Sequence, residues 1–146
     1  AADLFRGRAV IVTPSPSADL DDVARIAEFW ESLGAVVHSM SPTEHDQIVA
    51  ATSHLPHVLA SVLSAGIPAA WWELSAGGLR DTTRIASGDP DLWRQILLAN
   101  RDAVLTRLQQ FERDLAEFRA ALVAADAERL THHLALGKEK RDALGN

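Results

Sequence analysis

Histidines gather in one short stretch of the sequence. His45, His54 and His57 lie within 13 residues, and Asp46 and Ser53 are their polar neighbours. Imidazoles can donate hydrogen bonds to an anionic ligand, transfer protons or bind a metal. At about 100° per helical residue, His54 and His57 fall one turn apart on one face, and His45 lies about half a turn away. The stretch is therefore the first candidate for a binding site, with His45 contributing only from the first turn.

Three interpretations of the histidines remain open from the residues alone. The pair His54 and His57 could hold an anionic ligand, bind a metal together with His45 or Asp46, or be half-buried, hydrogen-bonded members of a packed helix. Zinc sites usually take four ligands from cysteine, histidine and carboxylate. Because the chain has no cysteine and His45 faces elsewhere, we predict no metal ligands.

Arg84 is the next candidate, because its guanidinium forms a planar fork that matches a carboxylate. Asp81 stands three residues earlier and could hold the fork in place, or the two could form an ordinary surface ion pair. Trp93 could line an apolar ligand or fill the core. Asn100 interrupts an apolar helix face, which suggests that it faces a polar cavity or water.

A helix must position the histidines. Ser41 can cap it, Pro42 suits its first position and Glu44 completes a capping box, so we expect a helix that runs to about Leu63. Pro56 removes a backbone donor and should bend this helix. The face expected to be buried carries Ile48, Leu55, Leu59 and Val62. The opposite, polar face carries Asp46, Ala50, Ser53, His54, His57 and Ser61.

The segment before this helix has the pattern of a βαβ unit. Residues 8–13 and 35–40 are short apolar runs typical of strands, and residues 19–33 have the periodicity of a helix. Strands joined by a helix should be parallel. Two strands cannot bury their own sheet faces, so we expect either that the sheet continues on another chain or that this chain is a piece of a longer one.

The rest of the chain should be helical. We expect a short helical turn at 69–74, a polar, glycine-containing loop at 75–84 and one long helix from Pro90 to about Ala124. Asp126 can cap a last helix. Apolar residues four and three apart along the long helix form a heptad stripe that should be shared with a partner subunit. The stripe comprises Val104, Leu108, Phe111, Leu115, Phe118 and Leu122; in the last helix, Leu130 and Leu134 should point inward.

Composition excludes some classes of function. A net charge of −6, with no local cluster of lysine and arginine, argues against a nucleic-acid partner. The absence of cysteine fits a reducing compartment, and we expect a cytoplasmic protein. The longest apolar run, 58–72, is interrupted by serine, glycine and proline and is shorter than the roughly 20 residues of a membrane span. We therefore expect no membrane partner.

Several segments resemble the prephenate dehydrogenase family, which includes the arogenate dehydrogenases. Ser-His-Leu-Pro-His at 53–57 and Asp-Thr-Thr-Arg-Ile-Ala at 81–86 are distinctive as a pair. The resemblance keeps its order and spacing from about residue 4 to residue 101, and the later helices match in type only. The other resembling segments are 8–14, 40–46, 77–80, 89–93 and 100–101.

The resemblance implies an N-terminal Rossmann domain for NAD or NADP and a C-terminal helical domain that forms a homodimer through its long helices. The reaction would be the oxidative decarboxylation of prephenate or arogenate in tyrosine biosynthesis. The family's catalytic histidine and nucleotide-binding glycines would lie upstream of Ala1, so no catalytic or cofactor-binding residue is expected here, and the sequence has no G-x-G-x-x-G pattern. The implied substrate-binding residues are His45, His54, His57, Asp81, Arg84 and Trp93.

The expected fold is mainly α. Residues 1–40 would be the terminal βαβ segment of a Rossmann-type α/β domain, and residues 41–146 a helical substrate-binding and dimerisation domain. Such a chain should not transfer hydride by itself. A helical metal-binding domain and an assembly module without catalysis are the alternatives that the residues leave open.

Overall fold

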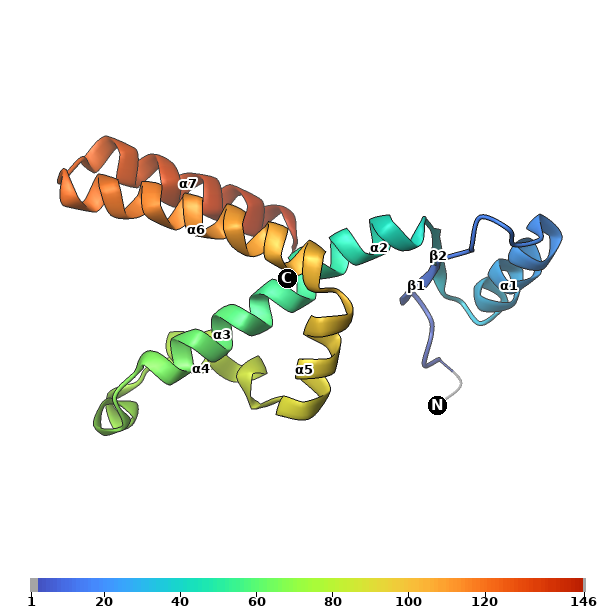
Figure 1. The fold of residues 1–146 in the computed structure, drawn as a ribbon, viewed down its shortest axis with the longest axis horizontal. Helices are drawn as coiled ribbons and strands as arrows, with labels where there is room; N and C mark the ends of the chain where they lie inside the picture. Colours follow the sequence, from blue (N-terminus) through green and yellow to red (C-terminus); the bar gives the residue numbers. More distant parts are fainter. Residues whose placement is uncertain (1–2, 146) are drawn as a thin grey trace. The chain divides into compact units, whose positions relative to one another are not determined.

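A computed structural model describes residues 3–145. The chain consists mainly of helices and has one two-stranded sheet near its N-terminus, which confirms the predicted fold class (Figure 1). It divides into two compact units, with the boundary between Val104 and Leu105. All the candidate site residues belong to the first unit.

The N-terminal segment forms the predicted βαβ unit. Strands β1 (Ala9–Val12) and β2 (Val36–Ser39) pair in parallel, and helix α1 (Leu20–Ser32) packs against both. The side chain of Asp19 caps α1 by accepting a hydrogen bond of 2.8 Å from the backbone N–H of Asp21. Apolar side chains of both strands remain exposed, as expected of a sheet with two strands.

The histidine-bearing segment is one continuous helical run with a widened turn inside it. Helix α2 (Pro42–Val49) leads into a π-helical turn, η1 (Ala50–His54), and then into α3 (Leu55–Gly66). Pro56 lies in the first turn of α3, where it has no N–H to give and its ring crowds the carbonyl four residues earlier. The π turn directly before it accommodates both effects, so the predicted disturbance of the helix takes this form.

The buried face of this run is the opposite of the one predicted. Ile48 is 38% exposed and Val62 is 66% exposed, whereas Leu55 and Leu59 are half-buried. The expected polar face supplies the packed side, because His54 and His57 on it face the following segments of the chain, while Ile48 and Val62 stay exposed. The buried residues are Ala50, His54, His57 and Ala60.

The run Pro42–Gly66 is also long and apolar enough to cross a membrane, with a mean hydropathy of 1.4. That criterion rests on length and composition only, and one such helix is weak evidence of a span, because core helices of soluble domains meet it too. Only 22% of the apolar window is buried, and His54 and His57 of this run contact Trp93 of a later helix.

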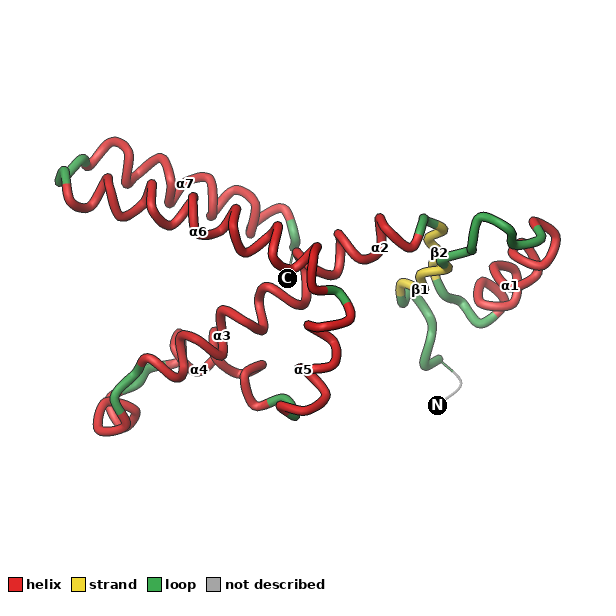
Figure 2. The backbone as a smooth tube through the Cα atoms, in the orientation of Figure 1, coloured by secondary structure: helices red, strands yellow, loops and turns green. Residues whose placement is uncertain are grey.

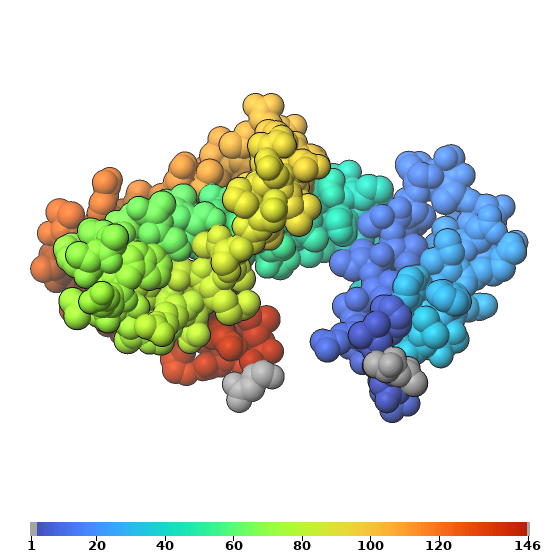
Figure 3. All heavy atoms as spheres, turned by 90° about the horizontal axis from the view of Figure 1, so that it is seen from below, coloured from blue at the N-terminus to red at the C-terminus, as the bar shows by residue number. Residues whose placement is uncertain are grey.

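After α3 comes the predicted helical turn, η2 (Ala69–Leu74). The loop predicted at 75–84 is wrong, since helix α4 (Gly77–Thr83) and the 3₁₀ turn η3 (Arg84–Ser87) occupy it. The two glycines of α4 lie in its first turn, and the helix is held by packing on α3 and by buried Thr83, whose hydroxyl donates to the Leu79 carbonyl at 2.7 Å. Side chains of α3, α4 and η3 lie against each other in Figure 3.

The long helix predicted from Pro90 to Ala124 is two helices. Helix α5 (Pro90–Ala99) ends at Asn100, whose backbone has left the helical region at φ −111° and ψ 31°, and α6 (Arg101–Val123) begins after it. The break appears as a short turn in Figure 2. The Asp89 side chain caps α5 by accepting a hydrogen bond of 2.8 Å from the Leu92 N–H.

The second unit is a helical hairpin. Helix α7 (Ala127–Ala143) runs antiparallel beside α6, and the rings of Phe118 and His133 meet with centroids 5.8 Å apart (Figures 1 and 2). Asp126 caps α7 as predicted. Leu134 is exposed rather than inward. Part of the predicted stripe stays uncovered, because Leu115 is 54% and Leu122 is 57% exposed.

Candidate functional site

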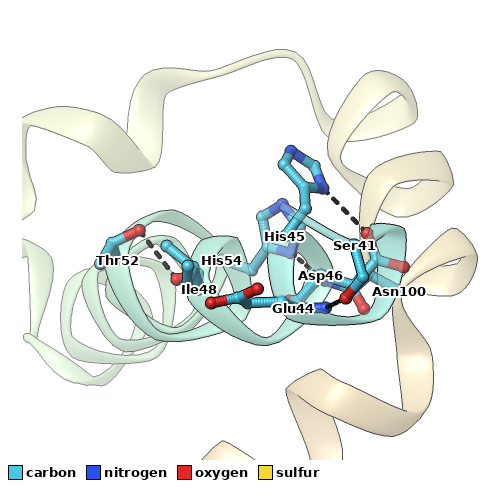
Figure 4. Close-up of polar contacts among 8 residues, drawn as sticks. All are labelled: Ser41, Glu44, His45, Asp46, Ile48, Thr52, His54 and Asn100. Carbon is cyan, nitrogen blue, oxygen red and sulfur yellow. Dashed lines mark hydrogen bonds and ion pairs between the residues drawn. The ribbon is translucent and has the colours of Figure 1, made fainter. Parts of the chain in front are cut away.

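His54 ends the π turn and is held by Asn100. The Asn100 side-chain nitrogen Nδ2 donates to the backbone carbonyl of Asp46 at 2.8 Å and lies 3.2 Å from Nδ1 of His54 (Figure 4). The His54 side chain is almost buried, with 9% of the residue exposed. Asn100 reaches it from the junction of α5 and α6. The contact therefore depends on the break between α5 and α6, since an uninterrupted helix would place the Asn100 side chain differently.

His45 pairs with its neighbour Asp46. Its Nδ1 lies 3.0 Å from the Asp46 carboxylate oxygen Oδ1, and the ring is half-buried (Figure 4). A straight helix would place His45 about half a turn from His54. The π turn between them alters that phase, and His45 lies close enough to His54 to act on its charge.

Both buried histidines favour their neutral form. Burial is the largest cause that lowers the pKa of His54 below 6.5; the Asp46 carboxylate opposes it and the His45 ring adds to it. Burial alone lowers the pKa of His57 from the same value. At neutral pH the site therefore presents uncharged imidazoles from both residues.

Trp93 of α5 packs against both His54 and His57, and the three rings form a cluster. Its ring stacks on His57 with centroids 3.5 Å apart and planes inclined by 11°, and it meets His54 edge-on at 6.2 Å. His57 is 5% exposed, and its Nδ1 is buried without a hydrogen-bond partner among the described residues. Gly88 closes the cluster: a Cβ there would lie 2.4 Å from Nε1 of Trp93 and 3.1 Å from Cε1 of His57.

A cavity of about 530 Å³ opens beside the stacked rings, between α3, η3 and α5. Its wall is largely apolar, with an arginine side chain from α5. Such a volume is typical of a site for a small organic molecule. Its lining includes His57, Val58, Val62, Trp93, Arg94 and Leu97.

Arg84 and Asp81 are not members of this cluster. Both are exposed, neither lines the cavity, and within residues 3–145 no ion pair joins them. The expected Asp81 clamp on the guanidinium is thus not formed here. The turn η3, which begins with Arg84, nevertheless packs against α3, the helix of His57. The guanidinium is left available to a ligand or a second chain.

His54, His57 and Trp93 were all named as candidates from the sequence, and the structure brings them together; the contacts of Asn100 and Gly88 with them were not predicted. Asn100 gave a signal, as a polar residue within an apolar helix face, but not its partners. Gly88 gave none, since only coordinates show that a tryptophan ring fills the place of its Cβ. The described chain also contains no group of three or more histidine, cysteine or carboxylate side chains arranged to hold a metal ion.

Comparison with known proteins decides the family. The family model for the dimerization domain of prephenate dehydrogenase matches residues 41–136. The chain belongs to the prephenate dehydrogenase family. Cyclohexadienyl dehydrogenase of Zymomonas mobilis is 37% identical over 98% of this chain, and prephenate dehydrogenase of Bacillus subtilis is 35% identical over 97%. The chain spans about half the length of these relatives, 51% and 40% respectively.

Solved structures of the prephenate dehydrogenase family share the fold. The prephenate dehydrogenase of A. aeolicus, crystallised with hydroxyphenyl propionate and NAD+, superposes with a TM-score of 0.88 and 33% identity over 97% of this chain and 52% of that one. Synechocystis arogenate dehydrogenase gives 0.89 and 27% over 97% and 54%. The resemblance seen in the sequence is confirmed, and the candidate residues from His45 to Asn100 all fall within the matched range 41–136.

Proposed function

We propose that this chain supplies the substrate-side and dimerisation parts of a prephenate or arogenate dehydrogenase, which carries out NAD(P)-dependent oxidative decarboxylation in cytoplasmic tyrosine biosynthesis. The observation that carries the proposal is the family match over residues 41–136, because that range contains every candidate substrate-binding residue. The assembled part of the site, His54 and His57 around Trp93, supports it with a neutral, aromatic-lined surface suited to a ring acid.

The nicotinamide cofactor does not fit the residues of this chain. The connection that follows β1 reads Thr-Pro-Ser-Pro-Ser and lacks the glycines that let a backbone approach a pyrophosphate. In this proposal residues 1–40 are the last βαβ segment of the nucleotide-binding domain, residues 41–146 form the helical domain, and the cofactor is held by residues outside both.

The proposed roles follow from charge and position. Arg84 provides the cation for a substrate carboxylate, and its exposed guanidinium has no competing partner among the described residues. His54 and His57 donate hydrogen bonds to oxygen atoms of the ring acid. Asp81 positions Arg84 once substrate or a second subunit is present, Trp93 walls the ring, and His45 borders the site from the first turn of α2.

Calorimetry with prephenate and with 4-hydroxyphenylpyruvate tests the proposal. We expect the folded chain to bind one or both, and the variant Arg84→Ala to lose binding. Arg80→Ala is the matched control, because Arg80 is another exposed arginine, four residues earlier on α4. No binding to the folded wild-type chain, or an equal loss in both variants, contradicts the proposal.

The dimer is proposed to form through the helices of the second unit, supported by the exposed leucines Leu115 and Leu122 and by the family's dimerization domain. Sedimentation at micromolar concentration should show a dimer that Leu115→Glu weakens and Gln109→Glu, at an exposed polar position of α6, leaves intact. A monomeric wild-type chain contradicts this part.

A further inference from the structure

We infer that Asn100 is a positioning residue that holds His54 as the tautomer protonated on Nε2, so that His54 presents an N–H donor, and not a proton acceptor, to the site. The inference rests on the proposed function only for the identity of the ligand. The tautomer itself follows from three atoms of the cluster: the Asp46 carbonyl oxygen, the Asn100 amide nitrogen and Nδ1 of His54.

The orientation of the Asn100 amide is fixed by the Asp46 backbone. A carbonyl oxygen only accepts hydrogen bonds, so the side-chain atom 2.8 Å from it must be the NH₂ group and not the amide oxygen. The same NH₂ group lies 3.2 Å from Nδ1 of His54. One of its hydrogens serves the carbonyl and the other points to the ring, so Nδ1 must offer its lone pair. The ring proton is then on Nε2.

A charged His54 does not fit this arrangement. An imidazolium carries hydrogens on both nitrogens, so its Nδ1–H would face the amide hydrogens of Asn100 and lose the hydrogen bond. Asn100 therefore acts in the same direction as burial, which lowers the pKa of this ring. The charged groups that bear on it are Asp46, which favours the cation, and His45, which disfavours it.

His45 has the reverse arrangement only nine residues earlier. Its Nδ1 lies 3.0 Å from a carboxylate oxygen of Asp46, which can only accept, so the proton of neutral His45 is on Nδ1 and its Nε2 is an acceptor. Asp46 thus determines the tautomer of both histidines. Its carboxylate acts directly on His45, and its backbone carbonyl acts on His54 through Asn100 (Figure 4).

The consequence for binding is a specific role for His54. Among residues 3–145 its ring makes no other hydrogen bond, so Nε2–H is available to a ligand. A neutral N–H donor suits a carboxylate, carbonyl or hydroxyl oxygen of a ring acid, and in a buried place it stabilises a developing negative charge without a charge of its own to desolvate. His54 is then a donor throughout the reaction, and any proton acceptor lies elsewhere.

Nitrogen NMR of the whole chain, labelled with ¹⁵N-histidine, tests this directly, since it distinguishes the two tautomers of a neutral ring. Signals are assigned with His45→Gln and His54→Gln. At a pH of about 7.5 we expect His54 to carry its proton on Nε2 and His45 on Nδ1. In Asn100→Asp a carboxylate of the same shape replaces the donor, so His54 should move its proton to Nδ1 and bind protons at least tenfold more tightly. In Asn100→Ala it should become a mixture of tautomers.

The His45 and His57 signals are internal controls, because a merely structural effect of the Asn100 variants would disturb all three rings. A wild-type His54 with its proton on Nδ1, or as an even mixture, overturns the inference without any variant, as does an unchanged His54 in a folded Asn100→Asp chain. The outcome is separable from the proposed function. An Nε2–H His54 in a chain that binds no ring acid refutes the function alone, and ring-acid binding with an Nδ1–H His54 refutes only the inference.

Discussion

Replacing Gly88 with alanine should damage the stacked cluster through steric contact alone. Gly88 has φ −63° and ψ 155°, a conformation that alanine adopts readily, so no backbone strain contributes. The new Cβ would lie 2.4 Å from Nε1 and 2.8 Å from Cδ1 of Trp93, and 3.1 Å from Cε1 of His57.

The size of the effect follows from these distances. Ordinary contact begins near 3.4 Å, so the indole must retreat by 3.4 − 2.4, or about 1 Å, from Gly88. It cannot retreat freely, because His57 lies stacked at 3.5 Å on its face. Overpacking of this kind typically costs about 1–3 kcal/mol of the free energy of unfolding. We expect Gly88→Ala to lose about 2 kcal/mol of the free energy of unfolding, together with much of the affinity for a ring acid that we propose above.

Urea denaturation followed by circular dichroism measures the loss, and calorimetry measures the affinity. Gly78→Ala is the matched control, since Gly78 is helical and a Cβ there meets nothing within 4 Å. It should be neutral or stabilise the chain by up to about 1 kcal/mol. If Gly88→Ala unfolds at the wild-type urea concentration, the packing described for Trp93 and His57 is wrong.

Three further experiments test the two buried histidines and the cap of α5. The pKa values of His54 and His57 lie below 6.5 in the folded chain, so the unfolded chain binds more protons as the pH falls below that value. The urea midpoint should therefore fall as pH drops from about 7.5 to 5, and a constant midpoint would refute this. His57→Phe keeps a ring on Trp93 and removes the unpartnered buried nitrogen, so it should stabilise the chain by about 1 kcal/mol and flatten the pH dependence in the same titration. Asp89→Ala removes the cap bond to Leu92 and should cost about 1 kcal/mol in urea denaturation; no change would show that the cap contributes nothing.

Local signals in the sequence predicted most of the elements. The caps at Ser41 and Asp126 each start a helix as expected, since a cap depends only on the next three residues. The βαβ unit was equally readable. The three candidate histidines stand out by type and spacing and stay a prediction, whereas the family could be recognised by its motifs.

Features that depend on distant neighbours were not predictable in the same way. Periodicity shows that a helix has an apolar face, but Ile48 and Val62 are exposed because no described segment covers them. The helix break at Asn100 depends on hydrogen bonds to residues about 50 positions away. Glycines marked residues 77–78 as a loop, whereas packing on α3 makes them the start of a helix.

The π turn at Ala50–His54 makes the site sensitive to chain length. A π turn accommodates one more residue than an α turn, so it shifts the angular phase of everything that follows. Deleting one residue, for example Ala51, would let the turn relax to α geometry and rotate α3 relative to α2. His57 would then leave the face of Trp93, and Asn100 could no longer bridge His54 to Asp46. In this segment, side-chain substitutions should be tolerated far better than insertions or deletions.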